Sequence, residues 1–325
     1  MFPGVLLALA LAHAEGPCTA PPARGAVADV AAAAATADSA VGVSVGPDPV
    51  PIATQVTHLM HGGTGEREER AILDILAPLD PATLAKVFRL IDQGSDEYDL
   101  DHLVYQDVDD AGRRARLLAL LAVAGAAEAE AGTLEIAVIS DIDDTAAPHH
   151  SRQGTKDYFY GAGTLFLALE RGPSGAGQAG DLHYVTARPP LVLGDARGRL
   201  ERAGMPEGTL DDGDLGQAIF RGAQGLEDEK VRDIERQLAL HPAQRFVLIG
   251  DDSQRDPEVY ARIRAAHPER VVGVLIHRVG GEARAASETV FFGDYGEAAD
   301  AAARWGAISE AQRQAVHAAV EGRGR

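Results

Sequence analysis

Lysine, cysteine and aromatic residues are scarce in this chain, and each scarcity narrows what the protein can be. Only one of its 325 residues is cysteine, Cys18, and aromatic residues make up 5%. A single cysteine excludes an intramolecular disulfide framework. Positive charge is also scarce, since 49 acidic residues face 30 basic ones and the formal net charge is -19. Because nucleic acid binding depends on neutralising phosphates, the composition argues against a nucleic acid partner.

The chain has only three lysines, Lys86, Lys156 and Lys230, so nearly all of its positive charge is arginine. The compact ammonium group of lysine cannot be replaced by the guanidinium of arginine. A lysine in a sequence this rich in arginine can therefore have a specific function. The net negative charge of the chain repels anions. We therefore expect an anionic substrate to be received by a local cation, such as Mg²⁺ or one placed lysine.

The first 54 residues predict a signal peptide followed by a linker. Residues 1–14, MFPGVLLALALAHA, form an apolar run that ends in the small-residue pattern of a cleavage site. The run is too short to span a bilayer comfortably, so we expect no transmembrane segment there. Cleavage would make the protein periplasmic or secreted, and without cleavage it would be cytoplasmic. Residues 15–54 are rich in Ala and Pro and predict a linker with no fold of its own.

Between residues 58 and 131 the apolar residues recur at helical spacing, which predicts a small helical domain. Its first segment, MHGGTGE from Met60 to Glu66, loosely resembles the start of an annexin repeat, although its loop is one residue short. That resemblance would imply Ca²⁺ or membrane binding. The simpler interpretation is an ordinary helix cap and a solvated acidic loop. The acids that would contribute are Asp96, Glu97, Asp99 and Asp101.

From residue 134 onward, apolar strand patterns alternate with helical ones. Strands are expected at residues 134–140, 181–187, 245–251 and 271–276. Helices are expected at 164–170, 191–203, 226–240, 258–267, 295–305 and 309–320. Such alternation predicts an α/β domain, a doubly wound parallel sheet covered by helices, over residues 134–320.

The segment LEIAVISDIDDT ends a buried strand with Asp141 and Asp143. Side chains two residues apart on an extended chain point the same way, and crowding two anions costs free energy unless a cation or a shared proton offsets it. Further polar residues follow in order: Thr186 after the next strand, Lys230 near the head of a helix, then Asp251 and Asp252. In open α/β sheets ligands bind at the carboxyl ends of strands, so these residues are candidates for one site.

These four motifs, in this order, resemble those of the haloacid dehalogenase superfamily. Within it, SDIDDT, FVLIGDDSQRDPEVYARI and VFFGDYGEAADAAARWGAIS are similar to the catalytic domain of the actin-patch-protein type phosphatidate phosphatases and their bacterial relatives. The chain departs from that family at residues 186–190, TARPP in place of a Ser-x-Ser-Pro-Trp segment. It also departs at Ala146, where a bulky apolar residue is usual. Both departures concern substrate selection rather than catalytic groups.

The resemblance implies a Mg²⁺-dependent phosphatase acting on a phosphate monoester, and the residue types suit that chemistry. Asp141 would be the nucleophile, and Asp143 would move the proton. Thr186 would donate a hydrogen bond to the phosphoryl oxygens, and Lys230 would balance the clustered negative charge. Mg²⁺ would be held by Asp141, the backbone carbonyl of Asp143 and Asp251, with Asp252 as a further metal contact. The substrate would be phosphatidate, with peripheral contact to a membrane, or a water-soluble phosphate ester.

Several neighbouring residues have simpler interpretations. Asp256 precedes Pro257 and fits a helix N-cap at least as well as a ligand. His149 and His150 lack a third ligand at suitable spacing, which favours a polar mobile loop. Asp144 is expected to face away from the metal. A non-catalytic alternative also remains, in which a vestigial phosphatase domain accompanies a helical module that binds Ca²⁺, membrane or a partner.

Overall fold

A computed structural model describes residues 46–61, 63–93, 98–149, 158–175, 181–186, 196–211, 215–280 and 289–322. All of these residues lie in one compact unit, residues 43–325. The predicted signal peptide and most of the predicted linker lie outside the described residues. Among the helices that are described, none is long and apolar enough to cross a membrane.

Helices precede the sheet and enclose an apolar core of their own, built mainly from Ile, Leu, Val and Phe. Asp80 and Asp110 cap two of these helices, each by accepting a hydrogen bond from the backbone amide three residues later. The elements are α2 (Pro49–Met60), α3 (Glu66–Leu76), α4 (Pro81–Asp92), the π-helix η1 (His102–Asp107) and α5 (Ala111–Ala131).

The predicted linker ends earlier than expected, because α2 already begins at Pro49. Asp48 caps this helix, since its Oδ1 accepts a hydrogen bond of 3.0 Å from the Val50 amide. Proline is preorganised for a first helical turn, where its missing amide costs nothing. Ala53 and Val56 bury the face of α2 that packs on its neighbours. The Ala- and Pro-rich composition of this segment predicted a linker, whereas its last residues form the start of a helix.

Six strands within the described residues form one parallel sheet, which confirms the predicted fold class. The strands are β1 (Ile136–Ser140), β2 (Leu182–Val185), β3 (Thr209–Asp211), β4 (Arg245–Asp251), β5 (Val271–His277) and β6 (Thr289–Phe292). Their order across the sheet is β3-β2-β1-β4-β5-β6, and every pair is parallel. The apolar runs predicted four of them. The edge strands β3 and β6 were not predicted; β6 is only partly buried, whereas all four residues of β2 are buried and give an apolar run.

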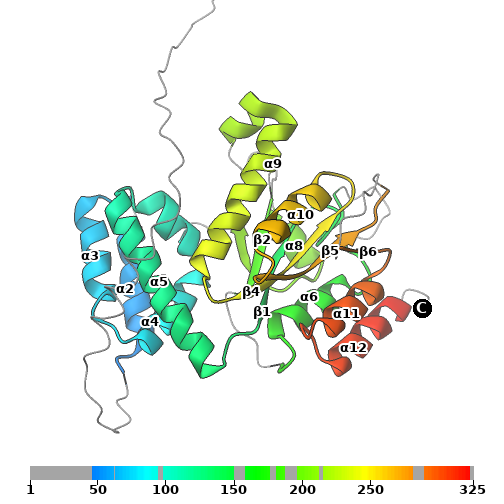
Figure 1. Ribbon diagram of the computed structural model, residues 1–325, viewed down its shortest axis with the longest axis horizontal. Helices are drawn as coiled ribbons and strands as arrows, with labels where there is room; N and C mark the ends of the chain where they lie inside the picture. Colours follow the sequence, from blue (N-terminus) through cyan, green and yellow to red (C-terminus); the bar gives the residue numbers. More distant parts are fainter. Residues whose placement is uncertain are drawn as a thin grey trace, which may run out of the picture. The chain divides into compact units, whose positions relative to one another are not determined.

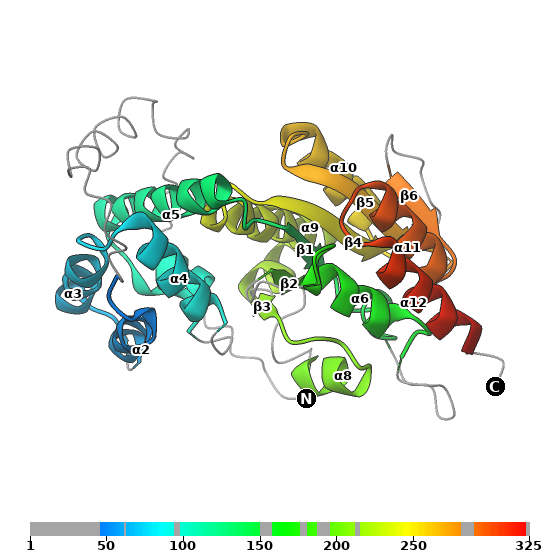
Figure 2. The ribbon, with the colours of Figure 1, turned by 90° about the horizontal axis from the view of Figure 1, so that it is seen from below.

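Helices cover both faces of the sheet, as Figure 1 shows. In β1, Ile136 and Val138 point into the core on one face, and Ala137 and Ile139 point into the core on the other. The first face carries α6, α8, α11 and α12, and the second carries α9 and α10. In Figure 2, α6 and α12 lie side by side across the first face. The helices are α6 (Ala162–Arg171), α8 (Ala196–Arg202), α9 (Leu215–Leu240), α10 (Asp256–Ala266), α11 (Tyr295–Arg304) and α12 (Glu310–Glu321).

The strand order places a switch point between β1 and β4. The chain leaves β1 toward β2 and β3 on one side, then crosses to β4, β5 and β6 on the other. In the register of this pair, Ser140 lies opposite Ile249, so both strands reach the same edge of the sheet. Ligands of open α/β sheets bind in the crevice at such a point. The residues that follow β1 and end β4 are therefore the first candidates for a functional site.

Candidate active site

Three carboxylates and one lysine form a buried cluster at the switch point. Asp141 follows β1, Asp251 ends β4, Lys230 comes from α9, and Asp256 is the first residue of α10. Lys230 Nζ lies 2.8 Å from Asp141 Oδ1 and 2.6 Å from Asp256 Oδ1. All four side chains are buried, the lysine with 6% exposure. The predicted group of Asp141, Lys230 and Asp251 is thus brought together.

The cluster holds more negative charge than Lys230 alone can offset. Burial raises the pKa of Asp141 to about 8, against the lowering effect of Lys230 and with the help of Asp256 and Asp251. Burial, followed by the charge of Asp256, likewise raises the pKa of Asp251 to about 6. Burial acts to lower the pKa of Lys230, but its carboxylate partners raise it well above the usual value. The ammonium therefore stays charged, and the carboxylates ionise readily only if a further cation is present.

The carboxylates also offer the oxygen ligands that a hard divalent cation needs. One oxygen of Asp141 and one of Asp251, the Oδ2 in each case, are buried without a hydrogen-bond partner among the described residues. One oxygen each from Asp141, Asp251 and Asp256 lies within 4.8 Å of the others. A buried, unpaired carboxylate oxygen is costly unless something binds it. The donor set is all oxygen, which suits Mg²⁺.

Asp256 occupies the place in this cluster that the sequence assigned to Asp252. Asp252 is a described residue outside the cluster, and its Oδ1 accepts hydrogen bonds from the amides of Val279 and Gly280 at 2.7 and 3.2 Å. It therefore anchors the turn that follows β5. Asp256 is not the N-cap of α10 either, because that position belongs to Arg255.

The backbone at Gly250 allows Asp256 to approach β4 closely. A Cβ at this glycine would lie 2.3 Å from Asp256 Oδ2 and 2.7 Å from a ring carbon of Tyr260. The carboxylate of Asp256 also accepts a hydrogen bond of 3.3 Å from the Asp251 amide. The one signal for Asp256 in the sequence was its position five residues beyond Asp251, which extends the acidic motif onto the next helix.

Asp143 lies in a second polar group beside the first, with two partners, Arg199 and His149, that sequence reasoning missed. Its Oδ1 accepts a hydrogen bond from Arg199 Nη2 at 2.7 Å and lies 3.2 Å from His149 Nδ1. Arg199 projects from α8 and also binds the carbonyl of Pro148 at 3.1 Å. His149 lies in a loop, as expected, and contacts Asp143 there, whereas His150 lies outside the described residues. Nothing in the sequence distinguishes Arg199 from the many other arginines.

The turn between Asp143 and His149 is held by its own backbone and by Asp144. Asp144 has a φ of 57°, in the left-handed region, and its amide donates to the carbonyl of Ala147 at 2.8 Å. Its Oδ1 accepts from the His149 amide at 2.9 Å, and its carbonyl accepts from His277 Nδ1 at 2.7 Å. Asp144 therefore stabilises the conformation of this turn, and its carboxylate binds the backbone amide of His149.

Thr186 directly follows β2, the neighbour of β1, and is buried with 2% exposure. It shares the carboxyl edge of the sheet with Asp141, as the motif order predicted. Thr186 is the first residue of the segment 186–190 that differs from the family pattern, and residues 187–190 lie outside the described residues.

The fold and the site together define an α/β protein with a doubly wound parallel sheet and an acidic cluster at its switch point. Residues 136–278 match the family model for the catalytic domain of phosphatidate phosphatase APP1. The matched segment runs from the first residue of β1 to just past β5, and it contains the acidic cluster, Asp143 and Thr186. The resemblance read from the motifs is therefore confirmed over this segment, and the match implies a phosphatase. Neither a search of curated proteins nor one of solved structures gave a match.

Proposed function

We propose that the protein hydrolyses a phosphate monoester with the help of Mg²⁺, through a phosphorylated aspartate. The observation that carries this proposal is the buried cluster of Asp141, Lys230, Asp251 and Asp256 at the switch point of the matched segment. Phosphoryl transfer needs a nucleophile aligned with the phosphorus and charges that offset the transferring group. The cluster contains both kinds of group.

In this proposal Asp141 attacks the phosphorus atom and carries the phosphoryl group between two steps. Lys230 binds Asp141 Oδ1, and Oδ2 has no hydrogen-bond partner within the part of the chain that the structure describes. Asp141, Asp251 and Asp256 would hold the Mg²⁺. When bound, that ion would offset the charge of the phosphoryl oxygens and favour the ionised form of the carboxylates. Thr186 would donate a hydrogen bond to the same oxygens.

Asp143 would protonate the leaving oxygen and afterwards accept a proton from the attacking water. Arg199 and His149 both contact its Oδ1, which fixes the orientation of the carboxyl group. A proton donor that is held in place loses little orientational freedom in the reaction. We infer that Arg199 and His149 are positioning residues for Asp143.

For the substrate we propose phosphatidate, with diacylglycerol as the product, because the matching family is described by that activity. A water-soluble phosphate ester is the alternative. We also propose export to the periplasm or the cell exterior, based on the pattern of residues 1–14. Detection of a mature chain that begins after residue 14 in the exported fraction would test this proposal.

The function is tested by measuring phosphate release from phosphatidate in detergent micelles and from a water-soluble monoester, with Mg²⁺ and with EDTA. We expect release that requires Mg²⁺ and is greater for phosphatidate. Asp141→Asn should abolish it, whereas Asp74→Asn, at an exposed site on α3, should leave it unchanged. Greater release from the soluble ester would select the alternative substrate. A folded protein that releases phosphate from neither compound would refute the proposal.

A further inference from the structure

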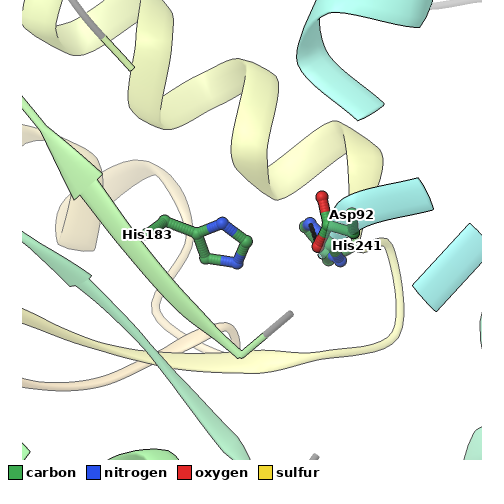
Figure 3. Close-up of side chains that lie close together, drawn as sticks. All are labelled: Asp92, His183 and His241. Carbon is green, nitrogen blue, oxygen red and sulfur yellow. Dashed lines mark ion pairs between the residues drawn. The ribbon is translucent and has the colours of Figure 1, made fainter. Parts of the chain in front are cut away.

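A second cluster of potential metal ligands lies away from the active site. Asp92 ends α4, His183 is the second residue of β2, and His241 directly follows α9. One ligand atom from each lies within 4.8 Å of the other two. Figure 3 shows His183 projecting from β2 toward Asp92 and His241. His183 lies near the amino end of its strand, whereas Asp141 follows the carboxyl end of β1, so the two clusters belong to opposite edges of the sheet.

Both imidazoles of this cluster have one buried nitrogen for which the described residues offer no hydrogen-bond partner. Nε2 of His183 and Nε2 of His241 are shielded from solvent, and neither has a hydrogen-bond partner among the described residues. The other nitrogen of His183, Nδ1, lies 2.8 Å from Thr209 Oγ1. Assigning the ring proton to this hydrogen bond leaves Nε2 with its lone pair. A histidine that ligates a metal commonly has its second nitrogen held in this way.

The distances within the cluster suit a bound ion better than a hydrogen bond. His241 Nε2 lies 3.6 Å from Asp92 Oδ2, which is too long for a hydrogen bond. Ligand atoms of a tetrahedral zinc ion, with bonds of about 2.0–2.1 Å, are separated by roughly 3.3 Å. The two imidazole rings lie 4.8 Å apart between centroids. Small side-chain rotations would therefore complete a site with these three ligands.

A cavity of about 40 Å³ adjoins the cluster and is lined in part by Asp92, His241 and Arg89. This volume exceeds what one water molecule needs, so water can complete the coordination of an ion. The positive charge of Arg89 is already paired, because its guanidinium contacts the carboxylates of Glu128 and Asp181.

We propose that Asp92, His183 and His241 bind one divalent transition metal ion, preferentially Zn²⁺, as a structural site that joins the N-terminal helices to the sheet. Two imidazoles select such ions over Mg²⁺ and Ca²⁺, which prefer oxygen ligands. The ligands come from α4, from β2 and from the end of α9, so a bound ion links three elements that are distant in the sequence. Burial of the site excludes a substrate and indicates a structural role.

The test is to produce the full chain with Zn²⁺, dialyse it exhaustively against metal-free buffer, and count zinc per chain by mass spectrometry. The Asp141→Asn variant serves as the background, because it weakens the active-site cluster as a competing zinc site. We expect one zinc ion per chain. The midpoint temperature of thermal unfolding should fall when a strong chelator removes the zinc. In His241→Gln the chelator should not change this temperature. His267→Gln, which alters a histidine paired with Glu235 elsewhere, is the matched control and should retain the zinc.

A variant that lacks one metal-binding side chain can fail to fold. The parent protein with Co²⁺ in place of Zn²⁺ therefore provides a second measurement. Bound at this site, Co²⁺ should give the intense visible bands of a four-coordinate ion with nitrogen ligands. Zinc binding that His241→Gln leaves unchanged, a parent protein that retains no zinc, or a weak octahedral Co²⁺ spectrum would each overturn the proposal. The buried histidines would then be a neutral packed pair.

Discussion

At the scale of single residues, the active-site cluster depends on one buried ammonium group, that of Lys230. Lys230 is surrounded by carboxylates at 2.6 and 2.8 Å and lies 5.5 Å from the ring centre of Tyr260. A buried charge of this kind is stable only while its partners remain, and the carboxylates depend equally on the lysine. The cluster is therefore a coupled unit, in which removal of one member affects the ionisation of the others.

Replacing Lys230 by Met should lower kcat about 100- to 1,000-fold, because a charge directed at the transferring phosphoryl group is lost. The side chain keeps its length, so the fold should persist with Mg²⁺ present. Steady-state phosphate release measures the effect. Lys86→Met, at an exposed position on α4, is the control and should be neutral. A Lys230→Met enzyme with unchanged kcat would remove Lys230 from the mechanism.

Part of this residue-scale site could be predicted from the sequence. Asp141, Asp143 and Asp251 come directly after apolar strand patterns, so their position at the sheet edge was predictable. Arg199 and His149 were not, because their role depends on where α8 and the turn after β1 meet in space. The role of Asp256 stayed open between a helix N-cap and a ligand, because a residue before proline at a helix start usually serves the helix itself.

At the scale of elements, close contacts between helix and strand position the site. Gly273 in β5 allows the ring of Trp305, which follows α11, to lie directly against the strand. A Cβ at residue 273 would come within 2.4 Å of that ring. The contact holds the C-terminal helices against the sheet. The apolar runs predicted the inner strands, which are buried on both faces, whereas the edge strands β3 and β6 were missed.

Gly273→Ala should reduce the free energy of unfolding by about 1–3 kcal/mol, because the new methyl group overpacks the contact with Trp305. Chemical denaturation, followed by circular dichroism, provides the measurement. Gly322→Ala is the matched control, since a Cβ there meets nothing within 4 Å. Equal stability of the two variants would show that the strand and the tryptophan are not in tight contact.

Helix α9 contributes a pH-sensitive carboxyl group at Asp233. Burial raises its pKa to about 7, against the lowering effect of Arg236 and Arg232. Its Oδ2 is buried with no hydrogen-bond partner among the described residues. The folded state therefore holds a proton that the unfolded state releases near pH 4, and this contribution to stability is lost as the pH rises through about 7.

Asp233→Asn should accordingly stabilise the protein at pH 8 by about 1–2 kcal/mol relative to the parent chain, and by less at pH 5. Unfolding by urea at both pH values gives the comparison, and the difference between the two proteins isolates this one group. A gain that is larger at pH 5 than at pH 8 would contradict the raised pKa.

At the scale of the whole molecule, the helices before the sheet and the sheet share packing within one compact unit, residues 43–325. Leu240, the last residue of α9, is 1% exposed and belongs to the core of the N-terminal helices. Arg236 stacks on the ring of Tyr105 at 4.8 Å from its centre. The sequence predicted a helical segment and an α/β segment, but these contacts join residues more than a hundred positions apart. No local pattern reveals them, and the same holds for the cluster of Asp92, His183 and His241.

Leu240→Ala should cost about 2–5 kcal/mol of unfolding free energy, the usual range for such a truncation in a core. Because the contact joins both parts, we expect one thermal transition at a lower temperature rather than two. Leu167→Ala, at a side chain 37% exposed on α6, is the control and should shift the transition far less. Calorimetry that shows two separate transitions in the parent chain would contradict this coupling.

The most direct test of the proposed chemistry is to mix enzyme, Mg²⁺ and substrate, quench with acid within one turnover, and analyse the peptides by mass spectrometry. The proposed mechanism predicts one added phosphoryl group on the peptide that contains Asp141, and none in the Asp141→Asn variant. Phosphate release without any such adduct, together with normal turnover by Asp141→Asn, would contradict it.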